Sequence, residues 1–288
     1  MTTTYDDYNY QSGDGLNLYA RIYGARNSDK TILCLPGLTR NSADFDLVAP
    51  HLAKKYRVVA MDLRGRGNSQ WDPKPENYIP QIYVQDVYQL MASLGLEKVA
   101  LIGTSLGGII SMILSSLTPE KVQGVVINDI GPEVDVAGID RIKSYVGGKA
   151  EFETWEELAL RCKDMNGAFF PDATDDEWMH MAKRTGRRLD DGRIIFNYDP
   201  ALAAPFKASN ENPEKFDMWS YFDALKGKPL LTIRGALSDL FSQDTFDKMA
   251  MVHGGMDGHI IANMGHAPMM DDAASLKALD QWAAKVFE

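Results

Sequence analysis

Short apolar runs alternate with longer segments of helical periodicity along most of this 288-residue chain. The apolar runs have the length and composition of buried strands, and they lie at 31–35, 57–61, 99–103, 122–129, 229–235 and 258–263. The helical patterns lie at 46–56, 78–94, from 105, near 242–251 and at 274–287. Strands that alternate with helices predict an α/β fold, in which helices cover both faces of a mainly parallel sheet. Such sheets carry their functional loops at the carboxyl ends of the strands.

Residues 132–222 interrupt this alternation with mostly helical patterns and no strand candidate. The segment is too long for a simple connection between two strands. We therefore expect a core formed by residues 1–131 and 223–288, with residues 132–222 inserted as a helical cap over the site.

Composition and charge limit the partners of the chain. The 45% hydrophobic and 24% charged residues are typical of a globular protein with a sizeable core, and the formal charge of −10 disfavours nucleic acid and anionic membranes as partners. The two cysteines form no disulfide framework, and the first residues do not resemble a signal peptide. We expect a cytoplasmic protein that acts on a small molecule; the sequence leaves open whether it forms a homodimer.

The segment Gly103-Thr104-Ser105-Leu106-Gly107-Gly108 lies where a predicted strand meets a predicted helix. A phosphate-binding loop would require Lys followed by Ser or Thr after the second glycine, and the dinucleotide motif has a different glycine spacing. Ser105 could simply cap the helix. The pattern G-x-S-x-G between strand and helix instead favours a nucleophile elbow, a sharp turn that exposes a reactive serine.

A serine nucleophile needs a histidine base and a carboxylate that orients it. Of the five histidines, His266 follows the last predicted strand at the edge where Ser105 lies, between a glycine and a nearby proline. Asp239 follows the strand at 229–235, and Asp129 ends the strand at 122–129. The order Ser105, Asp239, His266 matches the order expected for a nucleophile elbow of this kind, so we predict Asp239 as the acid and keep Asp129 as the alternative.

Acyl transfer also requires hydrogen-bond donors for the developing oxyanion. The backbone N–H of Leu106, directly after the serine, is the first predicted donor. The second should come from the loop after the strand at 31–35, where we choose Leu38 over Thr39.

Six segments together make the chain resemble the α/β-hydrolase superfamily, in particular its compact bacterial members with a helical cap. In chain order they are LPGLTRNSADF, MDLRGRGNS, GTSLGG, NDIGP, RGALSD and MGHAP. The resemblance implies that the loop from Asp62 to Ser69 lies beneath the site and that Arg64 and Arg66 are structural. Ser105 argues against the dehalogenases and epoxide hydrolases of this fold, which use aspartate. The C–C bond hydrolases commonly have an aromatic residue where this chain has Ala267.

These residues predict a serine hydrolase that cleaves an ester of a small, hydrophobic substrate through an acyl-enzyme, with no metal or organic cofactor. The predicted pocket is apolar because the cap is rich in aromatic residues and methionine, although we expect most of these side chains to pack between helices. Lactones, thioesters, C–C bonds and cofactor-free perhydrolysis remain open, as does a non-catalytic ligand receptor on the same fold.

Overall fold

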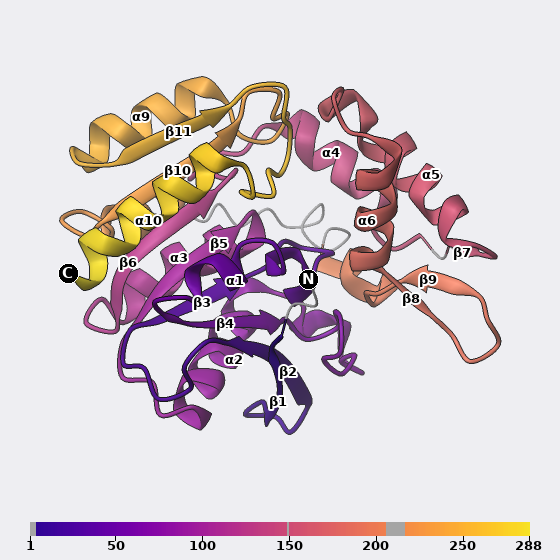
Figure 1. Cartoon of the computed structure of the whole chain (residues 1–288), viewed down its shortest axis with the longest axis horizontal. Helices are drawn as coiled ribbons and strands as arrows, with labels where there is room; N and C mark the ends of the chain where they lie inside the picture. Colours follow the sequence, from indigo (N-terminus) through magenta and orange to yellow (C-terminus); the bar gives the residue numbers. More distant parts are fainter. Residues whose placement is uncertain (1–3, 149, 206–216) are drawn as a thin grey trace.

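The computed structural model describes residues 4–148, 150–205 and 217–288, and its centre is an eight-stranded sheet (Figure 1). The strand order is β1-β2-β4-β3-β5-β6-β10-β11. The strands are β1 (Asp6–Gln11), β2 (Asn17–Tyr23), β3 (Thr31–Leu35), β4 (Arg57–Asp62), β5 (Val99–Thr104), β6 (Val122–Asn128), β10 (Leu230–Gly235) and β11 (Asp257–Ile261). Pairings from β4 to β11 are parallel, and β2 runs antiparallel to both β1 and β4. The predicted α/β fold is therefore confirmed.

Alternate residues of the central strands face opposite sides of the sheet, as a side-chain period of two requires. Leu33 and Leu101 join one apolar core, whereas Ile32 and Ile102 join the other. Helices α2 (Pro80–Ser93), α3 (Leu106–Leu117), α8 (Met218–Asp223) and α9 (Gln243–His253) contribute to the first core. Helices α1 (Ala49–Leu52) and α10 (Ala273–Phe287) contribute to the second. Both faces of the sheet are covered in this way.

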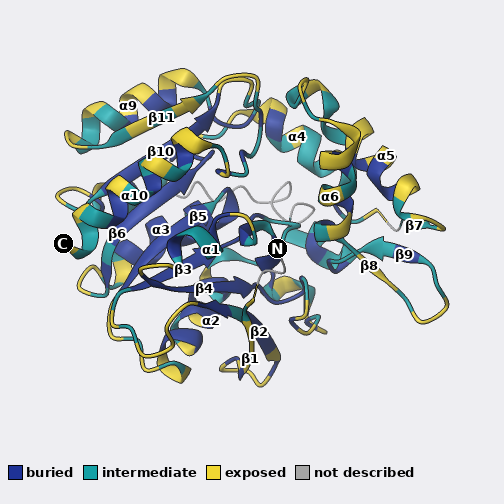
Figure 2. Cartoon of the chain, in the orientation of Figure 1, coloured by how far each residue is buried: buried dark blue, intermediate teal, exposed yellow. Residues whose placement is uncertain are grey.

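Helices α2, α9 and α10 each bury one face and expose residues of the other, whereas most of α3 is buried (Figure 2). In α10, Leu279 and Trp282 are fully buried against the sheet. The helix α1 is shorter than the pattern at 46–56 predicts, because the chain turns after Ala53 to enter β4. Within the described ranges, no helix combines the length and apolar character needed to cross a membrane.

The segment between β6 and β10 contributes no strand to the central sheet and contains α4 (Val136–Tyr145), α5 (Trp155–Asn166) and α6 (Asp175–Thr185). These helices gather at one side of the sheet with a second, three-stranded sheet (Figure 1). That sheet has the order β7-β9-β8 and consists of β7 (Glu151–Phe152), β8 (Gly186–Arg188) and β9 (Ile194–Phe196). The prediction of a segment without strands was wrong, because strands of two or three residues are too short to show alternation. Residues 149 and 206–216 of the predicted cap, and residues 1–3 of the predicted core, lie outside the described residues.

Short 3-10 helices lie in several of the connecting segments. They are η1 (Ser42–Phe45), η2 (Pro75–Asn77), η3 (Gly167–Phe169) and η4 (Pro200–Ala203). The first of them, η1, follows the loop after β3 and is capped by Asn41, whose side chain accepts a hydrogen bond from the Ala43 N–H. This loop therefore leaves the sheet in a fixed conformation beside the end of β5.

Candidate active site

Ser105 lies in the sharp turn between β5 and α3, with φ 53° and ψ −115°. A non-glycine residue in this region is strained by about 1–3 kcal/mol, a cost met at functional turns. A Cβ atom on Gly107 would lie 2.0 Å from the Leu35 carbonyl oxygen, and one on Gly103 would lie 2.3 Å from the Gly107 carbonyl oxygen. The turn therefore has room for glycine alone at both positions. The Ser105 side chain makes no capping hydrogen bond to α3, so the capping interpretation fails.

His266 lies beside this serine. Its Nε2 is 2.8 Å from Ser105 Oγ, and the His266 side chain is 10% exposed. Ser105 is 8% exposed. A neutral imidazole whose Nε2 carries no proton would accept the hydrogen bond of the serine hydroxyl. The structure thus brings together the predicted nucleophile and the predicted base, which are 161 residues apart in the chain.

The carboxylate beside His266 is Asp129, not Asp239. Asp129 Oδ2 lies 2.8 Å from His266 Nδ1, and its side chain is fully buried. Asp129 follows β6 directly and has φ 56°, a backbone conformation that turns its side chain out of the strand path. The prediction of Asp239 as the partner of His266 was wrong.

The Asp129 carboxylate is held by more than the histidine. Oδ1 accepts a hydrogen bond of 2.7 Å from the Gly235 N–H, and Oδ2 accepts one of 2.7 Å from the Ser238 hydroxyl. Both donors come from β10 or the loop that follows it. Three hydrogen bonds satisfy the buried carboxylate and fix its position against the imidazole.

The comparison with known proteins shows the family of the chain. A family model described as the alpha/beta hydrolase fold matches residues 30–273. The chain belongs to the α/β-hydrolase family. A 3-hydroxybutyrate-oligomer hydrolase of Cupriavidus necator is 34% identical over 268 residues, which are 90% of each chain. An esterase of Mycobacterium tuberculosis is 24% identical over 252 residues, 85% of this chain and 79% of the relative. A crystal structure of an alpha/beta hydrolase from Novosphingobium aromaticivorans, 40% identical, covers 99% of this chain and 100% of its own with a TM-score of 0.94.

Asp239 has a different partner in this α/β hydrolase. The Arg141 guanidinium donates to its carboxylate through Nε at 2.6 Å and through Nη2 at 2.9 Å. Arg141 lies on α4, and the Asp239 carbonyl also faces Gly138 of that helix, where a Cβ would approach to 2.7 Å. Asp239 therefore joins the loop after β10 to α4. Both acids follow neighbouring strands, so position at the sheet edge could not distinguish them.

The predicted oxyanion donors come from two different segments of the chain, the loop after β3 and the first turn of α3. Leu106 is the first residue of α3, where backbone N–H groups have no partner within the helix. Leu38 lies in a turn closed by a 3.2 Å hydrogen bond from the Arg40 N–H to the Gly37 carbonyl. Arg66 Nε donates to the Leu38 carbonyl at 2.7 Å, and Arg66 is fully buried. This bond fixes the turn beside the serine, and the side chain that provides it is one the resemblance marked as structural.

Arg64 is likewise buried and is bound by three carboxylates. Its guanidinium pairs with Asp86 at 2.7 Å, with Asp72 at 2.6 Å and with Asp14 at 2.9 Å. The Asp62 carboxylate, at the start of the loop below the site, accepts hydrogen bonds from the backbone N–H groups of Ser42 and Asn68. These contacts organise the loop from Asp62 to Ser69 and do not reach Ser105.

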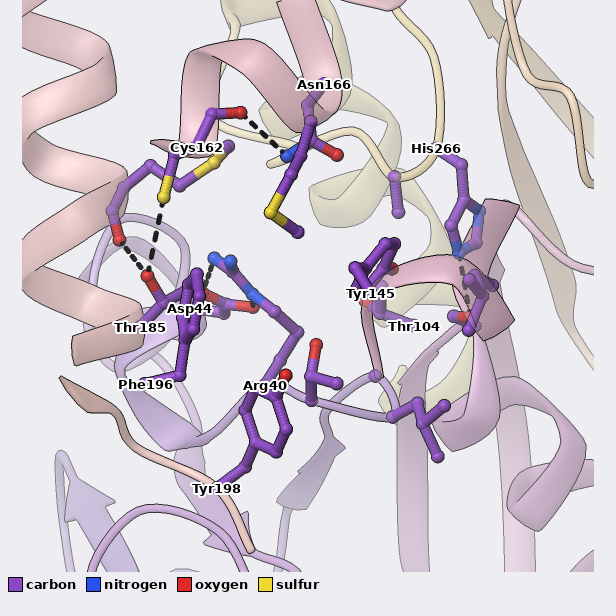
Figure 3. A pocket seen from close by; sticks show the side chains of 18 of the residues that line it. Arg40, Asp44, Thr104, Tyr145, Cys162, Asn166, Thr185, Phe196, Tyr198 and His266 are labelled. Atoms are coloured by element: carbon purple, nitrogen blue, oxygen red, sulfur yellow. Dashed lines mark hydrogen bonds and ion pairs between the residues drawn. The ribbon is translucent and has the colours of Figure 1, made fainter. Parts of the chain in front are cut away.

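Ser105 and His266 line a pocket between the core loops and the segment that carries α4 and α5 (Figure 3). Its apolar lining includes Ile142, Met165, Phe170, Met181, Phe196 and Met269. Among the aromatic residues between β6 and β10, Phe170 reaches the pocket, whereas Trp178 is 3% exposed and packs between α5 and α6. The sequence analysis missed Arg40 and Asp44, which also line this pocket. The sequence feature that could have identified them is an Arg and an Asp four residues apart, directly after the predicted oxyanion loop, a spacing that allows an ion pair.

Neither cysteine has the properties of a nucleophile. Cys34 and Cys162 are free and buried, and burial raises the pKa of both thiols. Cys162 lines the pocket, but the high pKa keeps its thiol protonated. Across residues 4–148, 150–205 and 217–288, no group of three or more His, Cys, Asp or Glu residues could hold a metal ion.

Proposed function

We propose that this α/β hydrolase cleaves carboxylic esters through an acyl-enzyme formed on Ser105. The observation that carries the proposal is the continuous chain of contacts from Ser105 Oγ to His266 Nε2, and from His266 Nδ1 to Asp129 Oδ2, both at 2.8 Å. A nucleophile, a base and an orienting carboxylate in this order are what acyl transfer requires.

His266 takes the proton of Ser105 as Oγ attacks the ester carbonyl. Asp129 holds the imidazole in the tautomer that leaves Nε2 free and stabilises the imidazolium that forms. The backbone N–H groups of Leu38 and Leu106 stabilise the oxyanion of the tetrahedral intermediate. His266 then protonates the departing alcohol. Water attacks the acyl-enzyme with the same histidine as base, and a carboxylic acid leaves.

The substrate class that we propose is a small ester of a hydroxy acid, such as a short hydroxyalkanoate oligomer. The relative from Cupriavidus necator is named as a hydrolase of 3-hydroxybutyrate oligomers, and its match spans 90% of both chains. The name of the mycobacterial relative, an esterase, supports the same type of bond. Residues 132–222 act as the cap in this proposal, because Tyr145, Cys162 and Phe196 of that segment line the pocket above Ser105.

The test is hydrolysis of p-nitrophenyl esters of increasing acyl length and of the 3-hydroxybutyrate dimer, with the Ser105→Ala variant beside the native protein. Saturable turnover that the variant loses would support the proposal. Native protein that binds these compounds without turnover would overturn it and favour a ligand receptor. Turnover of thioesters, lactones or vinylogous diketones, with none of esters, would move the activity to another bond type.

A cytoplasmic location remains part of the proposal. Both cysteines are free and buried in the structure, and free thiols are typical of proteins of a reducing compartment. Fractionation of cells that produce the protein would test it, since recovery outside the cytoplasm would contradict the assignment.

A further inference from the structure

Arg40 brings a positive charge into a pocket whose walls are largely apolar. It lies two residues beyond Leu38 in the loop after β3, and its side chain is 21% exposed. In Figure 3 Arg40 extends toward Cys162 and Thr185, with His266 at the opposite side of the pocket and Tyr145 between them. A guanidinium at one end and a nucleophile at the other give the pocket a defined polarity.

The Arg40 guanidinium is charged, and not all of its N–H groups are used by hydrogen bonds within the described residues. Burial alone opposes its charge, but the Asp44 carboxylate raises its pKa above the usual value. Asp44 accepts hydrogen bonds from Nε at 2.6 Å and from Nη2 at 2.5 Å. Nη1 donates to no residue within the described part of the chain. Its N–H groups are therefore available to a ligand.

A second cation lies beside this ion pair. Arg184 Nε is 3.9 Å from Asp44 Oδ1, and this nitrogen is buried without a hydrogen-bond partner among the described residues. Burial lowers the pKa of Arg184, and the charge of Arg40 lowers it further, against the opposing effects of Asp44, Asp271 and Asp46. One carboxylate thus lies between two guanidinium groups, and an additional anion at Arg40 would reduce their mutual repulsion.

We infer that Arg40 binds a free carboxylate of the substrate, so that the site selects anionic hydroxy acid esters over neutral esters. The inference rests on the proposed function, since the scissile ester must lie at Ser105 while the carboxylate lies at Arg40. Tyr145 would assist as a neutral donor, because burial raises the pKa of its phenol and keeps it protonated. This assignment changes the expected substrate from a purely hydrophobic ester to one with an anionic end.

Hydrolysis of a hydroxy acid dimer places the charge on the departing part of the molecule. The acyl C–O bond breaks as Ser105 Oγ bonds to the carbonyl carbon, and the proton held by His266 passes to the alkoxide oxygen that leaves. The released alcohol is a hydroxy acid that carries the carboxylate bound by Arg40. Water then adds to the acyl-enzyme and releases the second hydroxy acid.

The experiment compares kcat/KM for the 3-hydroxybutyrate dimer and its methyl ester, with products separated by chromatography. A charge-assisted hydrogen bond predicts a preference for the free acid of about tenfold or more in the native protein. Arg40→Gln should reduce that preference to near unity, and Arg40→Lys should restore part of it. Arg26→Gln is the matched control, because Arg26 pairs with Asp6 on the surface and does not line the pocket.

Equal kcat/KM for acid and methyl ester in the native protein, or an unchanged preference in Arg40→Gln, would overturn the inference while the proposed function stands. Absence of turnover of either compound and of p-nitrophenyl esters would instead contradict the proposed function.

A measurement on the native protein covers the case in which Arg40→Gln does not fold. 3-Hydroxybutyrate should inhibit hydrolysis of p-nitrophenyl butyrate about tenfold more strongly than 3-hydroxybutyramide, which has the same shape without the charge. Equal inhibition by the two compounds would overturn the inference.

Discussion

Asp129 Oδ2 lies 2.8 Å from His266 Nδ1, although 137 residues separate the two in the chain. The residues follow β6 and β11, which flank β10 in the sheet. The last residue of β10 supplies the Gly235 N–H, and the loop after β10 supplies the Ser238 hydroxyl, to the same carboxylate. Three strands thus meet at one buried group, and the position of the imidazole depends on all of them.

The glycines around Ser105 give a prediction about stability. Gly107→Ala would place a Cβ 2.0 Å from the Leu35 carbonyl oxygen, a backbone atom that cannot move without distorting β3. We expect the free energy of unfolding to fall by about 3 kcal/mol or more, measured by urea denaturation. In Gly13→Ala the new Cβ would lie 3.5 Å from the Gln89 side chain, an ordinary contact. An effect of Gly107→Ala no larger than that of Gly13→Ala would contradict this account of the turn.

Asn128 gives a prediction about catalysis. Its Nδ2 donates to the Pro268 carbonyl at 2.8 Å and to Thr104 Oγ1 at 3.1 Å, which joins the His266 loop to the end of β5. In Asn128→Ala the loop loses this restraint, so kcat for ester hydrolysis should fall about tenfold or more with little change in KM. Asn77→Ala removes a comparable bond to Asp72, away from the site, and is the control. Equal kcat in the two variants would show that Asn128 does not position the histidine.

The Arg64 cluster predicts a pH dependence of stability. The hydrogen bond from Arg64 lowers the pKa of Asp14 to about 2, against a smaller opposing effect of burial. A folded-state pKa below the unfolded value stabilises the fold at pH above about 4, and this contribution is lost as the pH falls from there toward about 2. The Asp14 side chain is 47% exposed, so the effect should stay below about 1 kcal/mol.

The measurement is the difference in free energy of unfolding between the native protein and Asp14→Asn, followed from pH 7 downward. The difference should be largest near neutral pH and shrink below about pH 4. Asp29→Asn is the control, because Asp29 is exposed and has no ion pair among the described residues. A difference that grows on acidification would contradict the assigned direction of the pKa shift.

The strand and helix periodicities were sufficient to predict the six parallel strands of the sheet, and the glycines around Ser105 were sufficient to predict the elbow. Both signals are local, because a buried strand and a crowded turn restrict the residues within a few positions. His266 could also be found, since few histidines compete and one follows the last strand. The structure and the family match confirm the fold that these patterns predicted.

The choice between Asp129 and Asp239 could not be made in this way. Both follow adjacent strands at one edge of the sheet, and the difference between them is a long-range one: Asp239 has Arg141 on α4 as its partner. Arg40 was missed for a similar reason, because its place in the pocket depends on how α5 and β9 lie over the loop after β3. Side-chain pairing between distant segments leaves no periodic pattern in the sequence.

The most direct test of the account compares Asp129→Asn with Asp239→Asn, with kcat/KM for one p-nitrophenyl ester measured in both. Loss of the carboxylate that orients the histidine should lower activity by about 10³–10⁴-fold in Asp129→Asn. Asp239→Asn weakens the contact with Arg141 and should retain activity within about tenfold of the native protein. A large loss in Asp239→Asn, with Asp129→Asn near native activity, would contradict the assignment of Asp129 as the acid.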